Sequence, residues 1–209
     1  MFVDFSTIEG ENMDARVDYL AYSVNGAMAP DGSPIKTVER DEEEQTIPWT
    51  WTKGGFVIRT VGKENEPAGT GYPIKEFDNS LGSTLEVKMR ILEAPASGFN
   101  GGALSLIDGQ REGKLSFFND RIEIRDVNDF RQAYEIDTND DFHVYRLTIA
   151  GDTLKAYVDG MEVAVVTLAN SNKERKILFG DFSPEEGENM YAQVEYLAYY
   201  VGGAVSPRS

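Results

Sequence analysis

The fold of this chain is decided by residues 142–163, which read FHVYRLTIAGDTLKAYVDGMEV. Apolar and polar side chains alternate on both sides of Gly151-Asp152, and a period of two predicts strands that each bury one face. Gly151-Asp152 predicts a two-residue hairpin turn, and Asp159-Gly160 predicts a second turn before a third strand over residues 161–168. We therefore expect a three-stranded antiparallel meander over residues 142–168.

The rest of the chain also has the pattern of a β protein. Residues 69–73 read as a loop, and Trp49 and Trp51 alternate with polar or small neighbours, so both are expected on one face, in the core. No segment has a convincing helical period, and turn residues recur at short intervals, which favours an all-β fold. Strands are predicted over residues 57–60, 84–92, 103–107, 114–118, 121–125 and 134–136.

The meander resembles the "FHxY…YVDGxxV" hairpin of the concanavalin A-like lectin/glucanase superfamily, which includes laminin-G-like modules and laminarinase-type glycosidases. Phe142, His143, Tyr145, Val163 and residues 157–160 carry the resemblance. It implies a two-sheet antiparallel jelly-roll β-sandwich, which we assign to residues 47–209. It says little about activity, because one fold hosts many functions.

Composition narrows the functional classes. The chain has 209 residues, with 36 acidic against 20 basic side chains and a formal net charge of −16, which argues against nucleic acid and anionic membrane surfaces as partners. No apolar run is long enough to cross a bilayer, so membrane insertion is not expected. Without cysteine, the chain has neither disulfides nor a thiol nucleophile. These features suit an acidic extracellular or cell-surface protein.

One segment occurs twice. Residues 2–30 and residues 179–207 align without a gap, and 19 of their 29 positions are identical, with an offset of 177 residues (179 minus 2). Each copy ends in an alternating strand, and alternation predicts that Val194, Tyr196 and Ala198 share one face. The simplest explanation is a tandem-repeat protein, in which residues 1–30 duplicate the closing strand and residues 31–46 form an acidic connection.

The duplicated strand has to pair somewhere, because an isolated strand is unstable. It could be the end of a preceding repeat or an extra strand in its own sandwich. It could also complete the sheet of a neighbouring molecule, which would give head-to-tail self-association through residues 2–30. We favour packing within the chain, because local closure costs less entropy than association.

The sharpest candidate for catalysis is the segment from Glu135 to Asp140, which is similar to the E-x-D-x-x-E signature of laminarinase-type glycosidases. Its third acidic residue is Asp140 instead of Glu, and in that family the signature lies well upstream of the hairpin. The segment is therefore expected to be the turn that enters the hairpin, and we assign no catalytic residue.

Two kinds of binding site are considered. Acidic loops could hold a structural calcium ion through oxygen ligands, and no other cofactor is expected. The leading calcium candidates are Asp137, Asn139, Asp140 and Asp141. Sugar binding needs exposed aromatic platforms beside polar groups. The candidates are Tyr72, Phe99, Asn100, Tyr134, Arg146 and Tyr157. The lone histidine, His143, is read as a packed or rim side chain.

The leading hypothesis from the sequence is a non-catalytic extracellular binding or adhesion module whose partner is a polysaccharide or cell-surface glycan. The first alternative is a structural subunit of a filament, assembled by strand complementation through the duplicated strand. The second is a glycoside hydrolase or polysaccharide lyase with a degenerate site.

Overall fold

The computed structural model describes residues 69–95, 102–127, 129–183 and 189–207, together with the backbone of three short strands nearer the N-terminus. The predictions for residues 1–30, for the side chains of Trp49 and Trp51, and for Phe99 and Asn100 lie outside the described residues. No helix long and apolar enough to cross a membrane occurs in this described part of the chain.

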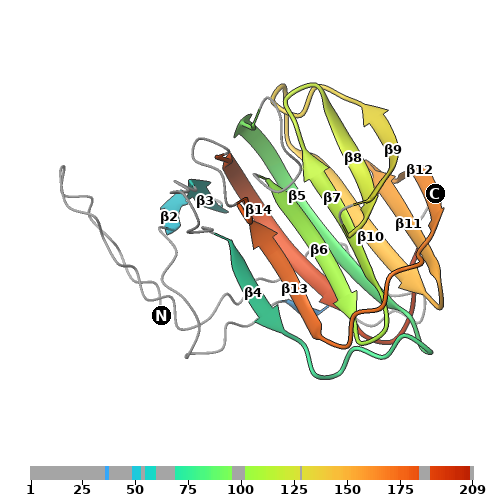
Figure 1. Cartoon of the computed structure of the whole chain (residues 1–209). Coiled ribbons are helices and arrows are strands. Elements are labelled where there is room, and N and C mark those ends of the chain that lie inside the picture. The colour runs from blue at the N-terminus through green and yellow to red at the C-terminus, as the bar shows by residue number, and fades with distance from the viewer. Residues whose placement is uncertain are drawn as a thin grey trace.

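In the part of the chain that the structure describes, fourteen strands form two antiparallel sheets, which lie one behind the other in Figure 1. The eight-stranded sheet has the order β12-β11-β10-β5-β14-β3-β2, with β1 paired to β14. Its strands are β1 (Lys36–Thr37), β2 (Trp49–Thr52), β3 (Gly55–Arg59), β5 (Ser83–Glu93), β10 (His143–Ala150), β11 (Thr153–Val158), β12 (Met161–Thr167) and β14 (Tyr191–Tyr200).

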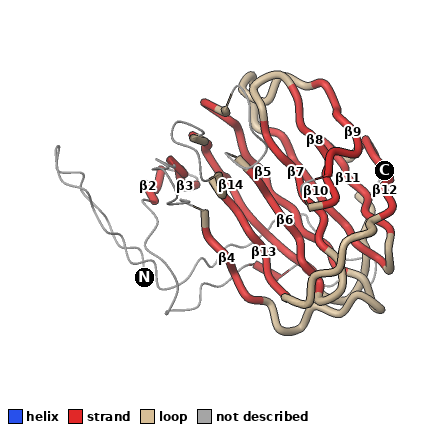
Figure 2. Tube along the Cα trace, in the orientation of Figure 1, coloured by secondary structure: helices blue, strands red, loops and turns tan. Residues whose placement is uncertain are grey.

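The six-stranded sheet has the order β4-β13-β6-β7-β8-β9. Its strands are β4 (Thr70–Pro73), β6 (Ala103–Asp108), β7 (Glu112–Phe117), β8 (Arg121–Asp126), β9 (Asp129–Glu135) and β13 (Arg175–Gly180). Strands and connecting loops make up all of the described chain, as Figure 2 shows. The predicted all-β jelly-roll sandwich is confirmed.

The core lies between the sheets and follows from the alternation within each strand. Leu85, Val87 and Met89 of β5 face Leu104 and Leu106 of β6 in one cluster of buried side chains. This cluster contains apolar residues from both sheets, so folding removes the inner face of each sheet from water. Each Å² of apolar surface that is buried in this way stabilises the fold by about 25 cal/mol. The outward-facing positions of the same strands are left for polar side chains.

The predicted meander is confirmed as β10, β11 and β12. Tyr145 pairs with Val158 and Ile149 with Leu154, so the register matches the expected hairpin. Gly151 has φ +58°, and Gly160 in the second turn has φ +84°. Both values lie in the left-handed region that glycine adopts without steric cost, which is why these positions set the register of the meander.

The expectation that Val194, Tyr196 and Ala198 share a face is wrong. A β-bulge lies between Val194 and Tyr196, where β14 pairs with Met89 and Lys88 of β5. The extra residue, Glu195, shifts the alternation by one. Ala192, Val194 and Leu197 consequently point into the core, while Tyr196 and Ala198 pack outside it.

Two boundaries also differ from the sequence predictions. The predicted loop over residues 69–73 contains edge strand β4, which pairs with β13, because an edge position tolerates Pro73 at the end of a strand. The strand predicted over residues 134–136 is longer and earlier, at β9. Gln132 of β9 lies opposite the core residue Ile124, and a β-bulge follows between Ile124 and Arg125, so the apolar alternation of β9 is weak in the sequence.

The C-terminal segment, residues 201–207, folds back over the outer face of the eight-stranded sheet. Thr84 Oγ donates to the carbonyl of Gly203 at 2.8 Å and accepts from the amide of Val205 at 2.9 Å. Gly82, with φ +87°, makes room for it, since a Cβ there would lie 2.7 Å from the nitrogen of Ala204. The segment therefore covers the part of this outer face around Thr84, Arg146 and Tyr157.

Candidate functional site

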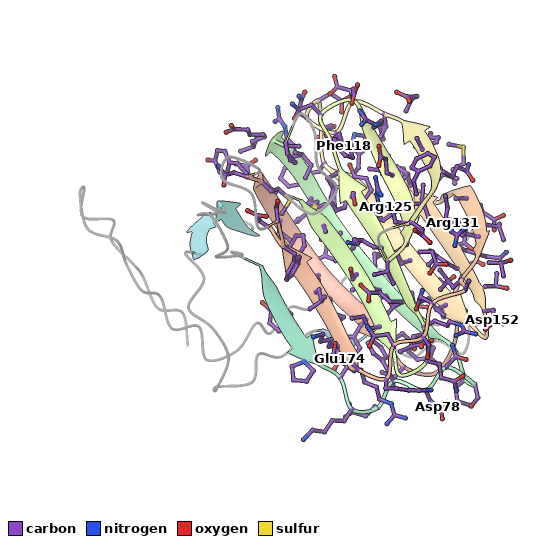
Figure 3. The ribbon with its side chains drawn as sticks, in the orientation of Figure 1. Asp78, Phe118, Arg125, Arg131, Asp152 and Glu174 are labelled. Atoms are coloured by element: carbon purple, nitrogen blue, oxygen red, sulfur yellow. The ribbon has the colours of Figure 1, made fainter. Side chains whose placement is uncertain are left out.

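The outer face of the six-stranded sheet carries an unusual set of side chains. Along β7 and β8 the apolar residues point into the core and the residues between them point outward, as a period of two requires. We call the outward set the charged face. It comprises Ser105, Lys114, Ser116, Arg121, Glu123, Arg125 and Phe130. Figure 3 labels Arg125 and Phe118 on this sheet.

One row of residues crosses the sheet through four strands. Ser105 of β6 is opposite Lys114 of β7, Lys114 is opposite Arg125 of β8, and Arg125 is opposite Phe130 of β9. Lys114 is only 5% exposed and Arg125 only 8%. Like charges directly opposite each other destabilise a sheet, and burial adds a desolvation cost. The row is therefore poorly explained as a device for stability.

The next row is organised around one carboxylate. Glu123 accepts hydrogen bonds from Arg121 Nε at 3.1 Å and from Arg125 Nη2. Arg121 also pairs with Asp120 at 2.9 Å, and its guanidinium lies 4.0 Å from the ring centre of Phe118. Glu123 thus fixes the two arginine side chains in place. Glu112 and Glu135 lie at the ends of the charged face, on β7 and β9.

The environment shifts the proton affinity of Lys114. Burial lowers the pKa of its ammonium group to about 8, with a further decrease from the positive charge of Arg125, while Glu112 opposes the shift. A lysine that exchanges its proton near neutral pH is chemically versatile, because it can act as a cation or as a base.

Phe130 provides the aromatic surface of the site. It is 54% exposed, although large aromatic side chains are usually covered, and the guanidinium of Arg125 lies 5.9 Å from its ring centre. An exposed ring beside hydrogen-bonding groups is the arrangement expected for a platform that binds a sugar ring.

Three of the predicted sugar contacts are not exposed. Tyr72 is 4% exposed and belongs to the core, because residues 70–73 form a strand. Arg146 and Tyr157 do point away from the core, but the C-terminal segment covers them. Tyr134 is half-buried and packs against the core cluster. The expectation of exposed platforms is therefore wrong at Tyr72, Arg146 and Tyr157.

Arg146 has a different set of partners. Its Nε donates to Glu86 Oε2 at 2.6 Å and its Nη1 donates to the carbonyl of Val205 at 3.1 Å. Tyr196 donates its hydroxyl hydrogen to the other oxygen of Glu86 at 2.8 Å. Tyr157 similarly contacts Ser206, with 3.0 Å between the hydroxyl oxygens. Arg146 and Tyr157 thus hold the C-terminal segment on the sheet.

The residues predicted to bind calcium lie in the connection between β9 and β10, which is where the hairpin was expected to begin. Asp137, Asn139, Asp140 and Asp141 are all exposed. Asp137 and Asp141 accept hydrogen bonds from nearby backbone amides, at 3.2 and 2.7 Å. Among the described residues, no group of three or more His, Cys, Asp or Glu side chains is arranged to hold a metal ion. Calcium binding stays a prediction.

His143 connects this loop to the β11–β12 turn. Its Nε2 lies 2.9 Å from Asp140 Oδ1 and its Nδ1 lies 2.7 Å from Asp159 Oδ2. Burial works to lower the pKa of the imidazole, but hydrogen bonds to the two carboxylates outweigh it and raise that pKa above its usual 6.5. The hydrogen bond from His143 in turn holds the pKa of Asp140 below its usual range. When the imidazole is protonated, this arrangement is an ion pair at the rim of the sandwich.

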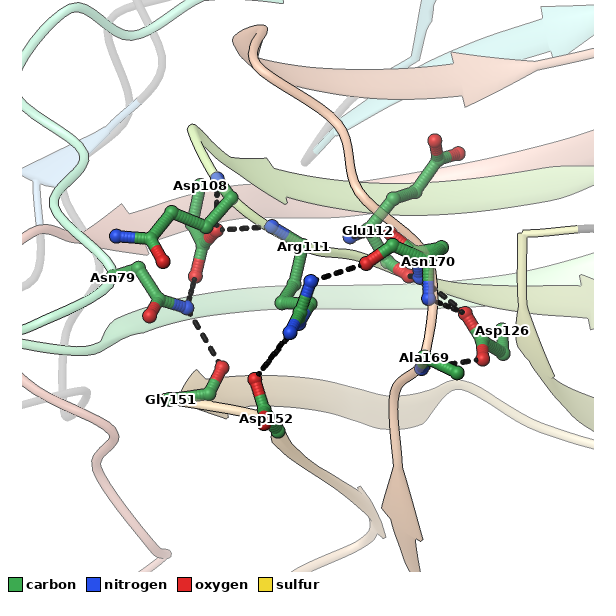
Figure 4. Close-up of polar contacts among 10 residues, drawn as sticks. Asn79, Asp108, Arg111, Glu112, Asp126, Gly151, Asp152, Ala169 and Asn170 are labelled. Carbon is green, nitrogen blue, oxygen red and sulfur yellow. Dashed lines mark hydrogen bonds and ion pairs between the residues drawn. The ribbon is translucent and has the colours of Figure 1, made fainter.

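A second polar cluster holds the opposite end of the sandwich together, as Figure 4 shows. Arg111 Nε donates to Asp152 at 2.8 Å, which joins the β6–β7 turn to the β10–β11 turn. The buried Asp126 accepts from the amide of Ala169 at 2.8 Å and from the side chain of Asn170. Neighbouring turns thus satisfy these carboxylates, and we regard the cluster as structural.

The chain is similar in structure to proteins of known fold. No protein-family model matches its sequence, and no curated protein matches it either. The Trypanosoma rangeli sialidase superposes with a TM-score of 0.58 at 19% identity, over 90% of this chain and 30% of the sialidase. The alginate lyase AlgAT5 of polysaccharide lyase family 7 has a TM-score of 0.52 at 12% identity, over 82% of this chain and 90% of the lyase.

The binding domain of botulinum neurotoxin serotype D has a TM-score of 0.52 at 15% identity, over 93% of this chain and 49% of that structure. At these identities the likeness shows a shared jelly-roll sandwich. This chain corresponds to about a third of the sialidase chain and half of the toxin structure.

The charged face was not predicted from the sequence, although the sequence contains a signal for it. Residues 114–125 alternate charged or polar side chains with Leu115, Phe117, Ile122 and Ile124. That alternation predicts strands with one solvent face. What it does not reveal is that β7 and β8 are inner strands, which brings Lys114 against Arg125 and Arg125 against Phe130.

Proposed function

We propose that the chain is a non-catalytic glycan-binding module of the concanavalin A-like type, and that the charged face is its binding site. Two of the similar structures are carbohydrate-active proteins by name, a sialidase and an alginate lyase. The observation that carries the proposal is the row in which Lys114 and Arg125 lie beside the exposed ring of Phe130. A glycan would stack a sugar ring on Phe130 and contact the cations with its polar groups.

The cations indicate which glycans bind best. Arg125 can form two parallel hydrogen bonds with a carboxylate or sulfate, and Lys114 adds a point charge beside it. We propose that the preferred ligands are polysaccharides with carboxylate or sulfate groups, even though the protein as a whole carries a charge of −16.

The test is a binding panel of uronate-containing, sulfated and neutral polysaccharides, measured by calorimetry at two salt concentrations. Phe130→Ala should weaken binding about tenfold, since a buried aromatic anchor is worth more than about 1 kcal/mol. Arg125→Met should weaken binding of charged polysaccharides and remove most of its salt dependence. Lys155→Met is the matched control, because Lys155 is a cation of the other sheet and pairs with Glu162.

No binding anywhere in the panel would contradict the proposed function. Equal binding to neutral and charged polysaccharides, lost in Phe130→Ala, would keep the function but contradict the charge preference. Binding that all the variants retain would move the site away from the charged face.

We also propose that the protein works outside the cell or on its surface, as one unit of a repeated protein. The support is the duplicated segment and the expected ligand, since structural polysaccharides are extracellular. Fractionation of the native producer, with detection of the protein in the medium or on the surface, would check this. Detection confined to the cytosol would contradict it.

A second candidate function, a polysaccharide lyase, is favoured by the pKa of Lys114. Proton abstraction next to a uronate carboxylate needs a base and a cation that neutralises the carboxylate. Lys114, with a pKa of about 8, could take the proton while Arg125 pairs with the carboxylate. The glycosidic C–O bond would break, a carbon–carbon double bond would form, and the leaving oxygen would take a proton from solvent.

Lyase activity has a distinct signature. The unsaturated product absorbs ultraviolet light, and a lysine base predicts a rate that rises with pH through about 8. Lys114→Met should abolish that absorbance change. If uronate polysaccharides bind but no unsaturated product forms, the non-catalytic function stands.

A further inference from the structure

The structure shows which positions of the closing strand matter to the sandwich. β14 is an inner strand, with β5 on one side and β3 on the other. Its buried residues are 2% exposed or less, and the bulge determines which they are. They are Ala192, Val194, Leu197 and Ala198, preceded by the fully buried Met190. The half-buried residues of β14 are Tyr191, Gln193, Glu195, Tyr196, Tyr199 and Tyr200.

The duplicated segment repeats these buried positions. With the offset of 177, all five buried residues have an identical counterpart near the N-terminus: Met13, Ala15, Val17, Leu20 and Ala21. Within the strand the copies differ at Asp14, Arg16, Asp18 and Ser23, whose counterparts are all half-buried. The two copies therefore agree wherever β14 is enclosed by the sandwich and differ only where it is partly open to solvent.

Contacts outside the core are repeated as well. Tyr19 corresponds to Tyr196, whose hydroxyl donates to Glu86. The segment that follows β14 is held by Thr84 and Arg146 through the backbone of Gly203 and Val205, so these contacts do not depend on side-chain identity. Their counterparts are Gly26 and Met28. Only the hydroxyl that Ser206 offers Tyr157 has no equivalent, because Ala29 replaces it.

The repeated residues fit only a position inside a sheet, between two neighbouring strands. An edge of a sheet offers pairing on one side only, whereas the repeated residues match a position between two strands, with the core on one face and Glu86 on the other. In this chain β14 already fills that position. We propose that residues 13–22 are an exchangeable closing strand, which takes the place of β14 in a second copy of the same sandwich and joins molecules head to tail.

Exchange is controlled by competition between the two strands. The chain's own β14 is tethered to its sandwich, so its effective concentration is high and isolated molecules stay closed. A donated strand wins when the resident strand is damaged, or when many molecules fold together. Because the donating and accepting surfaces differ, the contact is heterologous and extends into open chains. This proposal is independent of glycan binding.

The test uses the full-length chain and introduces an aspartate at a core position of β14, at the equivalent position of the N-terminal copy, or at both. Leu197→Asp disables β14, Leu20→Asp disables the copy, and a double variant disables both. We expect Leu20→Asp to be a folded monomer like the wild type. Leu197→Asp should fold cooperatively and form oligomers, seen by light scattering, because each sandwich receives its strand from another molecule. The double variant should fail to fold. Gln193→Asp is the matched control at a half-buried position of the same strand and should stay monomeric.

Two results would overturn the proposal. If Leu197→Asp is as unfolded as the double variant, the copy cannot replace β14. If Leu197→Asp is a folded monomer, the replacement does not involve a second molecule. Refolding adds a measurement that requires no damaged β14. Wild type refolded at rising protein concentration should yield oligomers that Leu20→Asp does not form, and equal yields from both would count against exchange.

Discussion

The outer faces of the two sheets both bury charged side chains, but they pair them in opposite ways. On the eight-stranded sheet, Glu86 lies opposite Arg146, so opposite charges meet across neighbouring strands, and Tyr196 and the C-terminal segment satisfy the remaining groups. On the six-stranded sheet, Lys114 lies opposite Arg125, so like charges meet across the strands, and Arg125 is paired with Glu123 of its own strand. All four residues of these two cross-strand pairs are buried.

The difference separates what stabilises this molecule from what it presents to a ligand. A buried pair of opposite charges with all its hydrogen bonds made is self-sufficient and gives a ligand nothing to bind. A buried pair of like charges beside an exposed ring costs stability, and such local costs are typical of functional sites. The comparison makes different predictions for substitutions on the two faces.

The largest effect is expected from Arg146→Met. It leaves the Glu86 carboxylate, which is 3% exposed, without its cation, and breaking such a buried pair costs about 3–5 kcal/mol of unfolding free energy. It also removes a contact that holds the C-terminal segment. Equilibrium denaturation with urea measures the loss.

The matched change on the other face is Arg125→Met, which should cost much less, because Glu123 keeps its hydrogen bond to Arg121. Replacing both Glu86 and Arg146 by apolar residues should recover most of the loss. An equal loss in Arg146→Met and Arg125→Met would mean that the two faces do not differ as described.

The second prediction concerns pH and Lys114. Its pKa is about 8 in the folded protein and 10.5 in the unfolded chain, so the unfolded chain binds more protons between these values. Stability should therefore rise by roughly 1–3 kcal/mol as the pH increases from 8 to 10.5. Denaturation of wild type and Lys114→Met across this range isolates the effect, because the variant lacks this contribution. Parallel curves for the two proteins would contradict it.

The smallest effect is expected at His143, which belongs to neither face. Its pKa is raised in the folded state, so the protonated imidazole stabilises the fold fully below pH 6.5 and loses this effect as the pH rises through the raised value. The gain is about 0.5 kcal/mol, since the paired carboxylates are exposed. Thermal melts at pH 6 and at pH 8.5 should differ less for His143→Gln than for wild type. A larger difference in the variant would reverse the assigned sign.

Local patterns predicted most of the sandwich. The turns at Gly151 and Gly160 and the alternation around Leu147 were enough to predict the meander, because both are short-range signals. The bulge at Glu195 could not be read, since Val194, Tyr196 and Ala198 offer a regular alternation that competes with the spacing of Val194 and Leu197. The position of Tyr72 could not be read either, since its strand depends on pairing with β13.

The site was harder to predict than the fold. The alternation of the hairpin correctly turns Arg146 and Tyr157 away from the core, yet a segment about 50 to 60 residues later in the chain covers them. Lys114, Arg125 and Phe130 come from three strands, and their meeting depends on strand order. Burial and neighbours across strands are long-range properties, which the period of a single strand does not contain.

The bulge at Glu195 also has a consequence for fidelity. Two residues of β14 oppose one position of β5 at this bulge. A copy of this strand that enters one residue out of step would therefore turn its leucine, the equivalent of Leu197, outward and would place a tyrosine in the core. Any guest strand must carry the same irregularity at the same point, as the counterpart Asp18 between Val17 and Tyr19 allows. The bulge therefore favours a strand whose core residues have the spacing of Val194 and Leu197, which the duplicated segment shares. An amphipathic strand of another protein, with uninterrupted alternation, would fit this position poorly.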